Sequence, residues 1–305
     1  MLTTESIIKL RQELEGKEIT VIGHDNIDVD SFISGILLSR LLNFLNIKNE
    51  FCILDKVKEE TAYNTVKELF GIDMKIYQKE EQSERNLFLV DHYETNHEGK
   101  VIACIDHHPT TKQNDYKFKY VNNSCATAYL IYKMMQFANY PIKKEDAEMV
   151  VAAMLNDTVS FRSSKTVKEE VDEVKELCEK YRIDFNRLER YGLCLNDITK
   201  MTDEEIISSG LKVYSFKRKN DVASSHLQLD GLPEKRVIKH WINLIKIKRI
   251  RMNYDMYVFI ICDTKYNKTY EYQITFNNVE CLVHDEILSR GKNIMPRIEA
   301  IILRR

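Results

Sequence analysis

Short apolar runs alternate with polar segments through the first part of the chain. Four such runs are rich in Val, Ile, Leu and Phe: EITVIGH (residues 18–24), NEFCILD (49–55), NLFLVDH (86–92) and KVIACIDHH (100–108). Between them, apolar residues recur at helical spacing, as at Ile33, Ile36, Leu37 and Leu41. Continuous apolar runs separated by helical patterns are typical of buried parallel strands. The alternation therefore predicts an α/β domain built on a doubly wound parallel sheet.

The second part of the chain has a different pattern. Residues 210–216, 223–230, 254–264 and 270–276 favour strands, and residues 234–252 favour a basic amphipathic helix that packs through Val237, Trp241, Leu244 and Ile245. The polar stretch between the two parts carries a capping box from Thr202 to Glu205. We therefore predict an α/β domain over residues 1–195 and a smaller α+β domain with a mixed sheet over residues 196–305.

Composition and charge limit the kinds of partner that the protein is expected to bind and the cellular compartment in which it is expected to occur. A chain of 305 residues suits two domains, and a net charge of −2 gives no general attraction for nucleic acid. The sequence has no apolar run near the roughly 20 residues that span a bilayer. Its seven cysteines include no C-x-x-C pair, which suits reduced thiols. We expect a cytoplasmic protein with neither a membrane nor nucleic acid as a partner.

Polar residues with metal-binding chemistry follow three of the predicted strands and one further apolar run. They are His24, Asp28 and Asp30 after the first strand, Asp91 after the third, Asp106, His107 and His108 after the fourth, and Asp157 after residues 150–155. Ligands gather at the carboxyl ends of parallel strands, and neighbouring carboxylates repel one another unless a cation lies between them. Each aspartate alone has a simpler interpretation, as a helix cap or turn residue. Together they favour a cluster that binds a divalent metal.

The order of these motifs resembles a known family. H-x-N-x-D-x-D-S at residues 24–31 is followed by V-D-H at 90–92, I-D-H-H at 105–108, and N-D-T at 156–158 before F-R-S. This order is similar to that of the DHH phosphoesterases, and most similar to the manganese-dependent (family II) inorganic pyrophosphatases. The C-terminal ILSRGKNIMPRIE (residues 287–299) resembles the Ser-Arg-Lys-Lys-Gln motif and following proline of that family's second, DHH-associated domain.

The resemblance implies a role for each candidate residue. One metal would be held by His24, Asp28 and Asp91, and the other by Asp30, Asp91, His107 and Asp157, so that Asp91 bridges them. Asp106 would orient an imidazole without binding metal, and His108 would bind phosphate and act as general acid. Lys212, Arg290 and Lys292 of the second domain would hold phosphate in an active site in the interdomain cleft.

The chemistry expected from such a site is hydrolysis of a phosphoanhydride. Two metals about 3.5–4 Å apart share a hydroxide and clamp the attacking and leaving oxygens of an in-line displacement. A mixed shell of histidine and carboxylate suits manganese or cobalt, and magnesium is expected to arrive with the substrate. The substrate expected first is inorganic pyrophosphate, which would give two phosphates. The family resemblance also allows a homodimer.

Three departures from the family pattern leave other functions open. Ile27 stands where a proline is usual, Tyr93 replaces an asparagine and Gly291 replaces a lysine. The loss of a lysine favours an exopolyphosphatase or another short-chain polyphosphate hydrolase as the first alternative. An oligonucleotide phosphodiesterase of the same superfamily is the second, although the sequence lacks the G-G-G-H stretch of those enzymes. A metal-binding regulatory protein without activity is the third.

Overall fold

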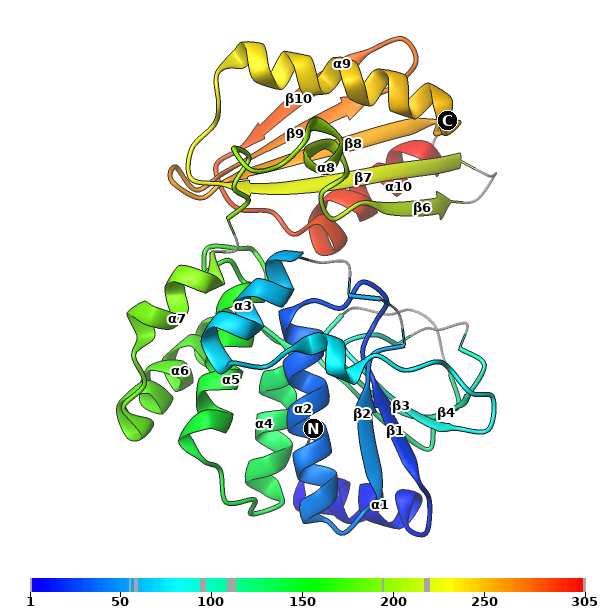
Figure 1. The fold of residues 1–305 in the computed structure, drawn as a ribbon, viewed down its shortest axis with the longest axis vertical. Coiled ribbons are helices and arrows are strands. Elements are labelled where there is room, and N and C mark those ends of the chain that lie inside the picture. Colours follow the sequence, from blue (N-terminus) through cyan, green and yellow to red (C-terminus); the bar gives the residue numbers. More distant parts are fainter. Residues whose placement is uncertain are drawn as a thin grey trace. The chain divides into compact units, whose positions relative to one another are not determined.

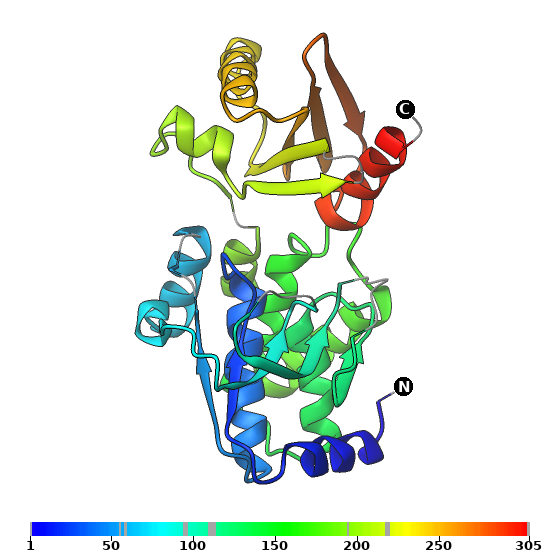
Figure 2. The same ribbon diagram turned by 90° about the vertical axis from the view of Figure 1, so that its right-hand side faces the viewer.

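The structure is a computed structural model that describes residues 2–54, 56–57, 60–93, 97–108, 114–193, 195–216 and 220–303. The chain divides into two compact units (Figure 1, Figure 2). The first comprises Met1–Phe161 and Thr166–Gly192, and the second comprises Arg162–Lys165 and Leu193–Arg305. The domain division predicted from the sequence, after residue 195, stays a prediction.

Five parallel strands form the sheet of the first unit, in the order β2-β1-β3-β4-β5. They are β1 (Ile19–Ile22), β2 (Asn49–Cys52), β3 (Asn86–Val90), β4 (Lys100–Asp106) and β5 (Phe118–Val121). This order is one of the two common doubly wound orders, and its winding reverses between β1 and β3, where such sheets bind ligands. The predicted parallel sheet is confirmed, although the sequence analysis did not predict β5.

Helices of the first unit pack on this sheet and enclose its main apolar core. They are α1 (Thr4–Leu14), α2 (Val29–Phe44), α3 (Glu60–Phe70), α4 (Thr127–Phe137), α5 (Lys144–Asp157), α6 (Lys168–Tyr181) and α7 (Phe185–Gly192), with a 3₁₀ turn at Met74–Tyr77. α2 approaches β2 closely, because a Cβ added to Gly35 would lie 2.1 Å from the ring of Phe51. The residues that follow β1 therefore lie on a tightly packed support.

The opposite face of the sheet carries a smaller apolar cluster. Ile22, Leu89 and Cys104 point to this face because side chains alternate along a strand. The rings of Tyr93 and Tyr116, from loops beyond the strands, complete the cluster with centroids 5.4 Å apart. The loop after β3 is thus anchored on the back of the sheet.

A mixed five-stranded sheet forms the centre of the second unit, in the order β10-β9-β8-β7-β6. Its strands are β6 (Lys212–Phe216), β7 (Asn220–Leu229), β8 (Met256–Asp263), β9 (Lys268–Ile274) and β10 (Val279–His284). β7 and β8 run parallel and the other neighbours antiparallel. The crossover between β7 and β8 contains α9 (Lys235–Arg251), whose Trp241 and Ile245 are buried against the sheet. The predicted mixed sheet and packed basic helix are confirmed.

Shorter elements complete the second unit. α8 (Asp203–Ser208) begins with the predicted capping box, and a π-helical turn, η2 (Arg290–Ile294), leads into α10 (Met295–Leu303). The segment 162–165 joins this unit, because Ser164 N donates to the Ile287 carbonyl at 2.9 Å. Within the described part of the chain, every helix is too short or too polar to cross a membrane.

Candidate metal centre

The loop between β1 and α2 carries three of the predicted ligands. Its start passes so close to α2 that a Cβ added to Gly23 would lie 2.4 Å from Ser31 Oγ, which explains the glycine. The next residue, His24, donates its backbone N–H to the same Ser31 Oγ at 3.1 Å. Asn26 adopts a left-handed conformation (φ 55°) that asparagine tolerates better than most residues. These features fold His24 back over the N-terminus of α2.

The first group of donors joins this loop to the end of β3. His24 Nε2 lies 3.3 Å from Asp28 Oδ2 and 3.4 Å from Asp91 Oδ2. Asp28 is also the N-cap of α2, because its other oxygen, Oδ1, accepts from Ser31 N at 3.0 Å. The cap and the ligand interpretations of Asp28 are therefore compatible, since each uses a different oxygen.

The second group brings together Asp30, His107 and Asp157, from the start of α2, the end of β4 and the end of α5. His107 Nε2 lies 3.3 Å from Asp157 Oδ2 and 4.0 Å from Asp30 Oδ2. The other ring nitrogen, Nδ1, lies 3.0 Å from the Ser124 carbonyl oxygen, which accepts a hydrogen bond from it. This bond leaves Nε2 as the lone-pair nitrogen, the form of histidine that binds metal.

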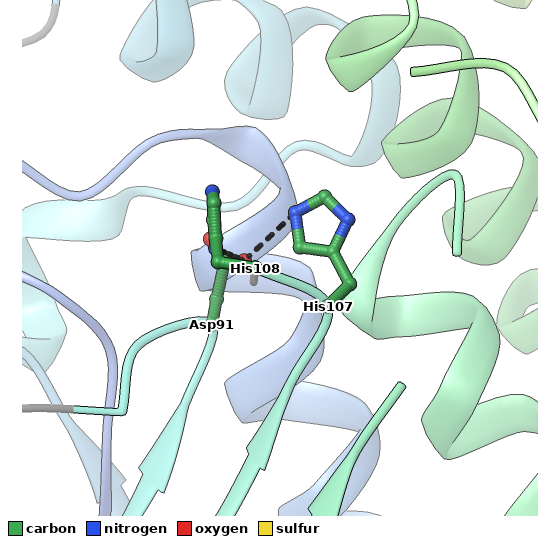
Figure 3. Close-up of side chains that lie close together, drawn as sticks. All are labelled: Asp91, His107 and His108. Atoms are coloured by element: carbon green, nitrogen blue, oxygen red, sulfur yellow. Dashed lines mark ion pairs between the residues drawn. The ribbon is translucent and has the colours of Figure 1, made fainter. Parts of the chain in front are cut away.

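Asp91 is shared between these groups. Its Oδ2 faces His24, whereas its Oδ1 lies 3.4 Å from His107 Nε2 (Figure 3). The residue directly follows β3 and has a φ of 63°, a left-handed conformation that is uncommon outside glycine. Its N–H donates to the Ile105 carbonyl of β4 at 2.9 Å. The neighbouring strand therefore fixes the turn that points Asp91 into the centre.

His108 and Asp106 form a pair beside the centre. Asp106 Oδ1 accepts from both the backbone N–H and the Nδ1 of His108, at 3.0 and 2.9 Å. Asp106 is buried, whereas the His108 side chain is 42% exposed. His108 Nδ1 also lies 3.6 Å from Asp91 Oδ1 (Figure 3). Asp106 thus orients the imidazole of His108 and not that of His107.

Burial and charge make this centre unfavourable without a cation. Burial raises the pKa of Asp30 well above its usual range, and the charges of Asp91, Asp157 and Asp28 add to the effect. Burial also acts to raise the pKa of Asp91, but the hydrogen bond from His24 and the charges of His108 and His107 outweigh it and lower that pKa. Buried carboxylates in contact need a compensating positive charge.

The donor set fits divalent metal ions. In each of three groups, one ligand atom per residue lies within 4.8 Å of the others: His24, Asp28 and Asp91; Asp30, His107 and Asp157; and Asp91, His107 and His108. Two imidazoles and four carboxylates suit manganese, cobalt or zinc better than calcium, which prefers oxygen. All six predicted metal ligands lie in this one centre at the carboxyl edge of the sheet.

The second unit brings two predicted phosphate contacts to one place. Lys212 pairs with Ser224 across β6 and β7, and Arg290 Nη1 donates to the Ser224 carbonyl at 3.3 Å. Arg290 also donates to the Gly210 carbonyl. Lys292 lies on the π-helical turn, where its N–H donates to Ser289 Oγ at 3.3 Å. Lys212 and the guanidinium of Arg290 therefore both lie beside Ser224 of β7, and Lys292 follows on the same turn as Arg290.

The departures from the family pattern have local explanations. Ile27 is buried in the main core, so an apolar contact takes the place of a rigid proline. Tyr93 is buried on the back of the sheet, and its Oη accepts from Asn114 N at 3.0 Å and Lys119 Nζ at 3.1 Å. Gly291 is exposed, and a Cβ added there would meet no atom of the described residues within 4 Å. Tyr93 thus supports the loop after β3, whereas Gly291 leaves open space beside the π-helical turn.

The sequence analysis missed the residues that hold the ligands. Thr127 Oγ1 donates to Asp91 Oδ1 at 2.9 Å, and Ser34 Oγ donates to Asp30 Oδ1 at 3.2 Å. The stretch SCATA (residues 124–128), which includes the first two residues of α4, was the available signal, because small hydroxyl residues gather at helix N-termini. His92, which follows Asp91, points elsewhere: its Nδ1 lies 2.9 Å from the Val90 carbonyl, and among the described residues it joins none of the metal-binding groups.

Comparison with known proteins agrees with this geometry. Residues 18–155 match the model of the DHH family, N-terminal domain. The manganese-dependent inorganic pyrophosphatase of Methanocaldococcus jannaschii is 27% identical to this chain, over 92% of the chain and 97% of the relative. That of Bacillus subtilis is 26% identical, over the same shares.

A solved structure shares the fold. It is described as "Crystal structure of Methanococcus jannaschii putative family II inorganic pyrophosphatase", and it aligns with a TM-score of 0.71 at 24% identity. The alignment covers 92% of this chain and 98% of that one. At this identity the likeness shows the fold alone, and it includes both the parallel-sheet unit and the mixed-sheet unit.

Proposed function

We propose that this chain, whose residues 18–155 match the DHH family model and which is similar to manganese-dependent inorganic pyrophosphatases, hydrolyses inorganic pyrophosphate to two phosphates. In this proposal, His24, Asp28 and Asp91 hold one divalent metal. Asp30, Asp91, His107 and Asp157 hold the other. The metal is manganese or cobalt, and magnesium enters with the pyrophosphate.

One observation carries the proposal: the two carboxylate oxygens of Asp91 face two different groups of donors. Oδ2 lies 3.4 Å from His24 Nε2, and Oδ1 lies 3.4 Å from His107 Nε2. A carboxylate in this orientation is suited to bridge two ions. Bound divalent ions would polarise phosphoryl oxygens and lower the pKa of water, which is the chemistry that phosphoanhydride hydrolysis needs.

The chain itself supplies orientation and a proton. Asp106 accepts from Nδ1 of His108, so Nδ1 keeps its proton and the ring is held beside Asp91. We propose that His108, with 42% of its side chain exposed, contacts a phosphate and gives a proton to the leaving group. Lys212, Arg290 and Lys292 would bind the remaining phosphate oxygens, with the guanidinium fork of Arg290 making the stronger contact.

A second candidate function follows from the space at Gly291. A Cβ at this exposed position would meet no described atom within 4 Å. A site that lacks a lysine here has one phosphate contact fewer and more room. This feature favours tripolyphosphate or a longer chain as a second substrate class.

The test is phosphate release from pyrophosphate, tripolyphosphate and a dinucleotide, with manganese and magnesium present, for the wild type and Asp91→Ala. Fast turnover of pyrophosphate that is lost in Asp91→Ala is the expected result. Faster release from tripolyphosphate would move the assignment to a polyphosphatase. Cleavage of the dinucleotide would support a phosphodiesterase, and manganese binding without turnover of any substrate would support a regulatory protein.

A further inference from the structure

A short turn, residues 124–128, supports the candidate metal centre from behind. It leads from β5 into α4, whose first two residues are Thr127 and Ala128, and it contacts three of the proposed ligands. The Ser124 carbonyl accepts from His107 Nδ1 at 3.0 Å. The backbone N–H groups of Thr127 and Ala128 donate to the two oxygens of Asp30, at 2.7 and 3.0 Å. Asp30 thereby caps the N-terminus of α4, whose own N-cap, Ala126, has no side chain to do so.

Thr127 is the member of this turn that contacts two proposed ligands. Its N–H donates to Asp30, and its Oγ1 lies 2.9 Å from Asp91 Oδ1. The threonine hydroxyl is the donor in this bond, and the Asp91 oxygen accepts. The side chain of Thr127 is fully buried, so water does not compete for the bond.

The bond determines which way each Asp91 oxygen points. Oδ1 receives the Thr127 hydroxyl and faces His107, whereas Oδ2 faces His24. A rotation of the carboxylate would break the Thr127 bond and would turn both oxygens away from their groups. We infer that Thr127 is a positioning residue, which holds Asp91 in its bridging orientation and thereby sets the affinity for manganese. This inference rests on the proposed function.

The turn is itself fixed from the side remote from the centre. Glu170 of α6 accepts from Ser124 Oγ at 3.0 Å and from Cys125 N at 2.7 Å. Val167 N donates to Cys125 Sγ at 3.1 Å. The hydroxyl of Thr127 therefore projects from a rigid backbone, which is what positioning of a ligand requires.

The experiment measures manganese binding to the metal-free protein by electron paramagnetic resonance, for the wild type, Thr127→Val and Thr127→Ser. Valine has the shape of threonine and keeps the N–H bond to Asp30, but it lacks the hydroxyl. We expect Thr127→Val to bind manganese roughly 10- to 100-fold more weakly, as is usual for partners that orient metal ligands. Thr127→Ser restores the hydroxyl and is expected to restore affinity. Thr65→Val, at a buried threonine of α3, is the matched control.

The outcomes separate this inference from the proposed function. If the wild type binds manganese and Thr127→Val binds it equally well, the positioning role is wrong and the proposed function stands. If the wild type binds no manganese, the proposed metal centre itself is wrong. A purely structural role would lower the melting temperature of the metal-free protein in Thr127→Val and leave the affinity unchanged. Should Thr127→Val fail to fold, Thr127→Ala compared with Thr127→Ser gives the same test.

Discussion

The candidate metal centre of the first unit and the cationic group of the second, Lys212, Arg290 and Lys292, are built in opposite ways. Asp30, Asp91 and His107 are 1–2% exposed, and neighbouring backbone or hydroxyl groups hold each of them. Lys212 is exposed, and Arg290 and Lys292 are only half-buried. The centre of the first group consists of buried anions and an imidazole, and the other group consists of cations that water can reach.

The difference indicates what each group binds. Buried carboxylates in contact are costly unless a cation compensates them, so a bound divalent ion would stabilise the first unit. Cations with access to water do not need a resident counter-ion, so we expect the second unit to take up an anion and release it. A hydrolase for small polyanions needs both, because its metals stay while its substrate and product exchange. Substitutions in the two units should therefore change different quantities.

The largest effect is expected for His107→Gln. It removes the imidazole that contacts both Asp91 and Asp157, so one metal should be lost. We expect manganese to bind more than about 100-fold more weakly and phosphate release to fall by roughly 1000-fold. Metal titration of the metal-free protein and steady-state kinetics measure these changes. Normal manganese affinity in His107→Gln would contradict the assignment of the first unit.

The next effect concerns the second unit and should leave metal binding intact. Arg290→Ala removes the guanidinium that contacts Ser224, the residue that pairs with Lys212 across β6 and β7. Since a charged hydrogen bond contributes about 1.5–3 kcal/mol, we expect KM for pyrophosphate to rise roughly 10- to 100-fold. Manganese affinity should not change. Arg290→Lys keeps the charge but not the fork, and it should recover part of the loss. A change in manganese affinity without a change in KM would contradict the separate roles of the two units.

Much of this organisation follows from local sequence signals. The apolar runs predicted β1 to β4 because buried parallel strands leave no polar face, and the ligand residues directly follow such runs. The short β5 was not predicted, since only the first residue of FKYV is buried and the other three are exposed or half-buried. α4 and α5 were also missed, because helices that are buried nearly all round show little amphipathic periodicity.

The support of the centre could not be predicted in the same way. Thr127 lies 36 residues from Asp91 in sequence, and Glu170 lies 46 from Ser124. Only the packing of α4 and α6 on the sheet brings them together. The left-handed turn at Val159, Ser160 and Phe161, which follows Asp157, is held locally, because Ser160 N donates to the Leu155 carbonyl at 2.7 Å, but no simple sequence signal marks it. Ligand types follow from sequence motifs, whereas their orientation follows from tertiary contacts.

A third prediction concerns pH and the second unit alone. Burial lowers the pKa of His226 to about 3, and the charges of Arg290 and Lys165 add to the effect. In the unfolded chain, histidine takes up a proton near pH 6.5. Unfolding therefore binds a proton between pH 6.5 and 3, and stability falls as the pH falls through this window. We expect the second unit to be roughly 1–2 kcal/mol less stable at pH 5 than at pH 7 from this group.

Denaturant titrations at the two pH values measure the effect, with His226→Gln as the variant that cannot titrate. The expected result is a smaller loss of stability on acidification in His226→Gln than in the wild type. Arg290→Ala should raise the pKa of His226, which NMR titration of the ring would detect. An equal loss in the wild type and His226→Gln would mean that the folded structure does not lower the pKa of His226.

The smallest effect is expected for Tyr93→Phe, which tests whether the loop after Asp91 belongs to the scaffold or to the site. The phenol oxygen accepts from Asn114 N and Lys119 Nζ, so its removal should lower the free energy of unfolding by about 1 kcal/mol. Phosphate release should be unchanged, because the ring faces the back of the sheet. Tyr116→Phe, in the same cluster, is the matched control. If Tyr93→Phe slowed turnover more than about tenfold at unchanged stability, Tyr93 would act in the site, and the separation between a fixed metal centre and its supporting loops would not hold.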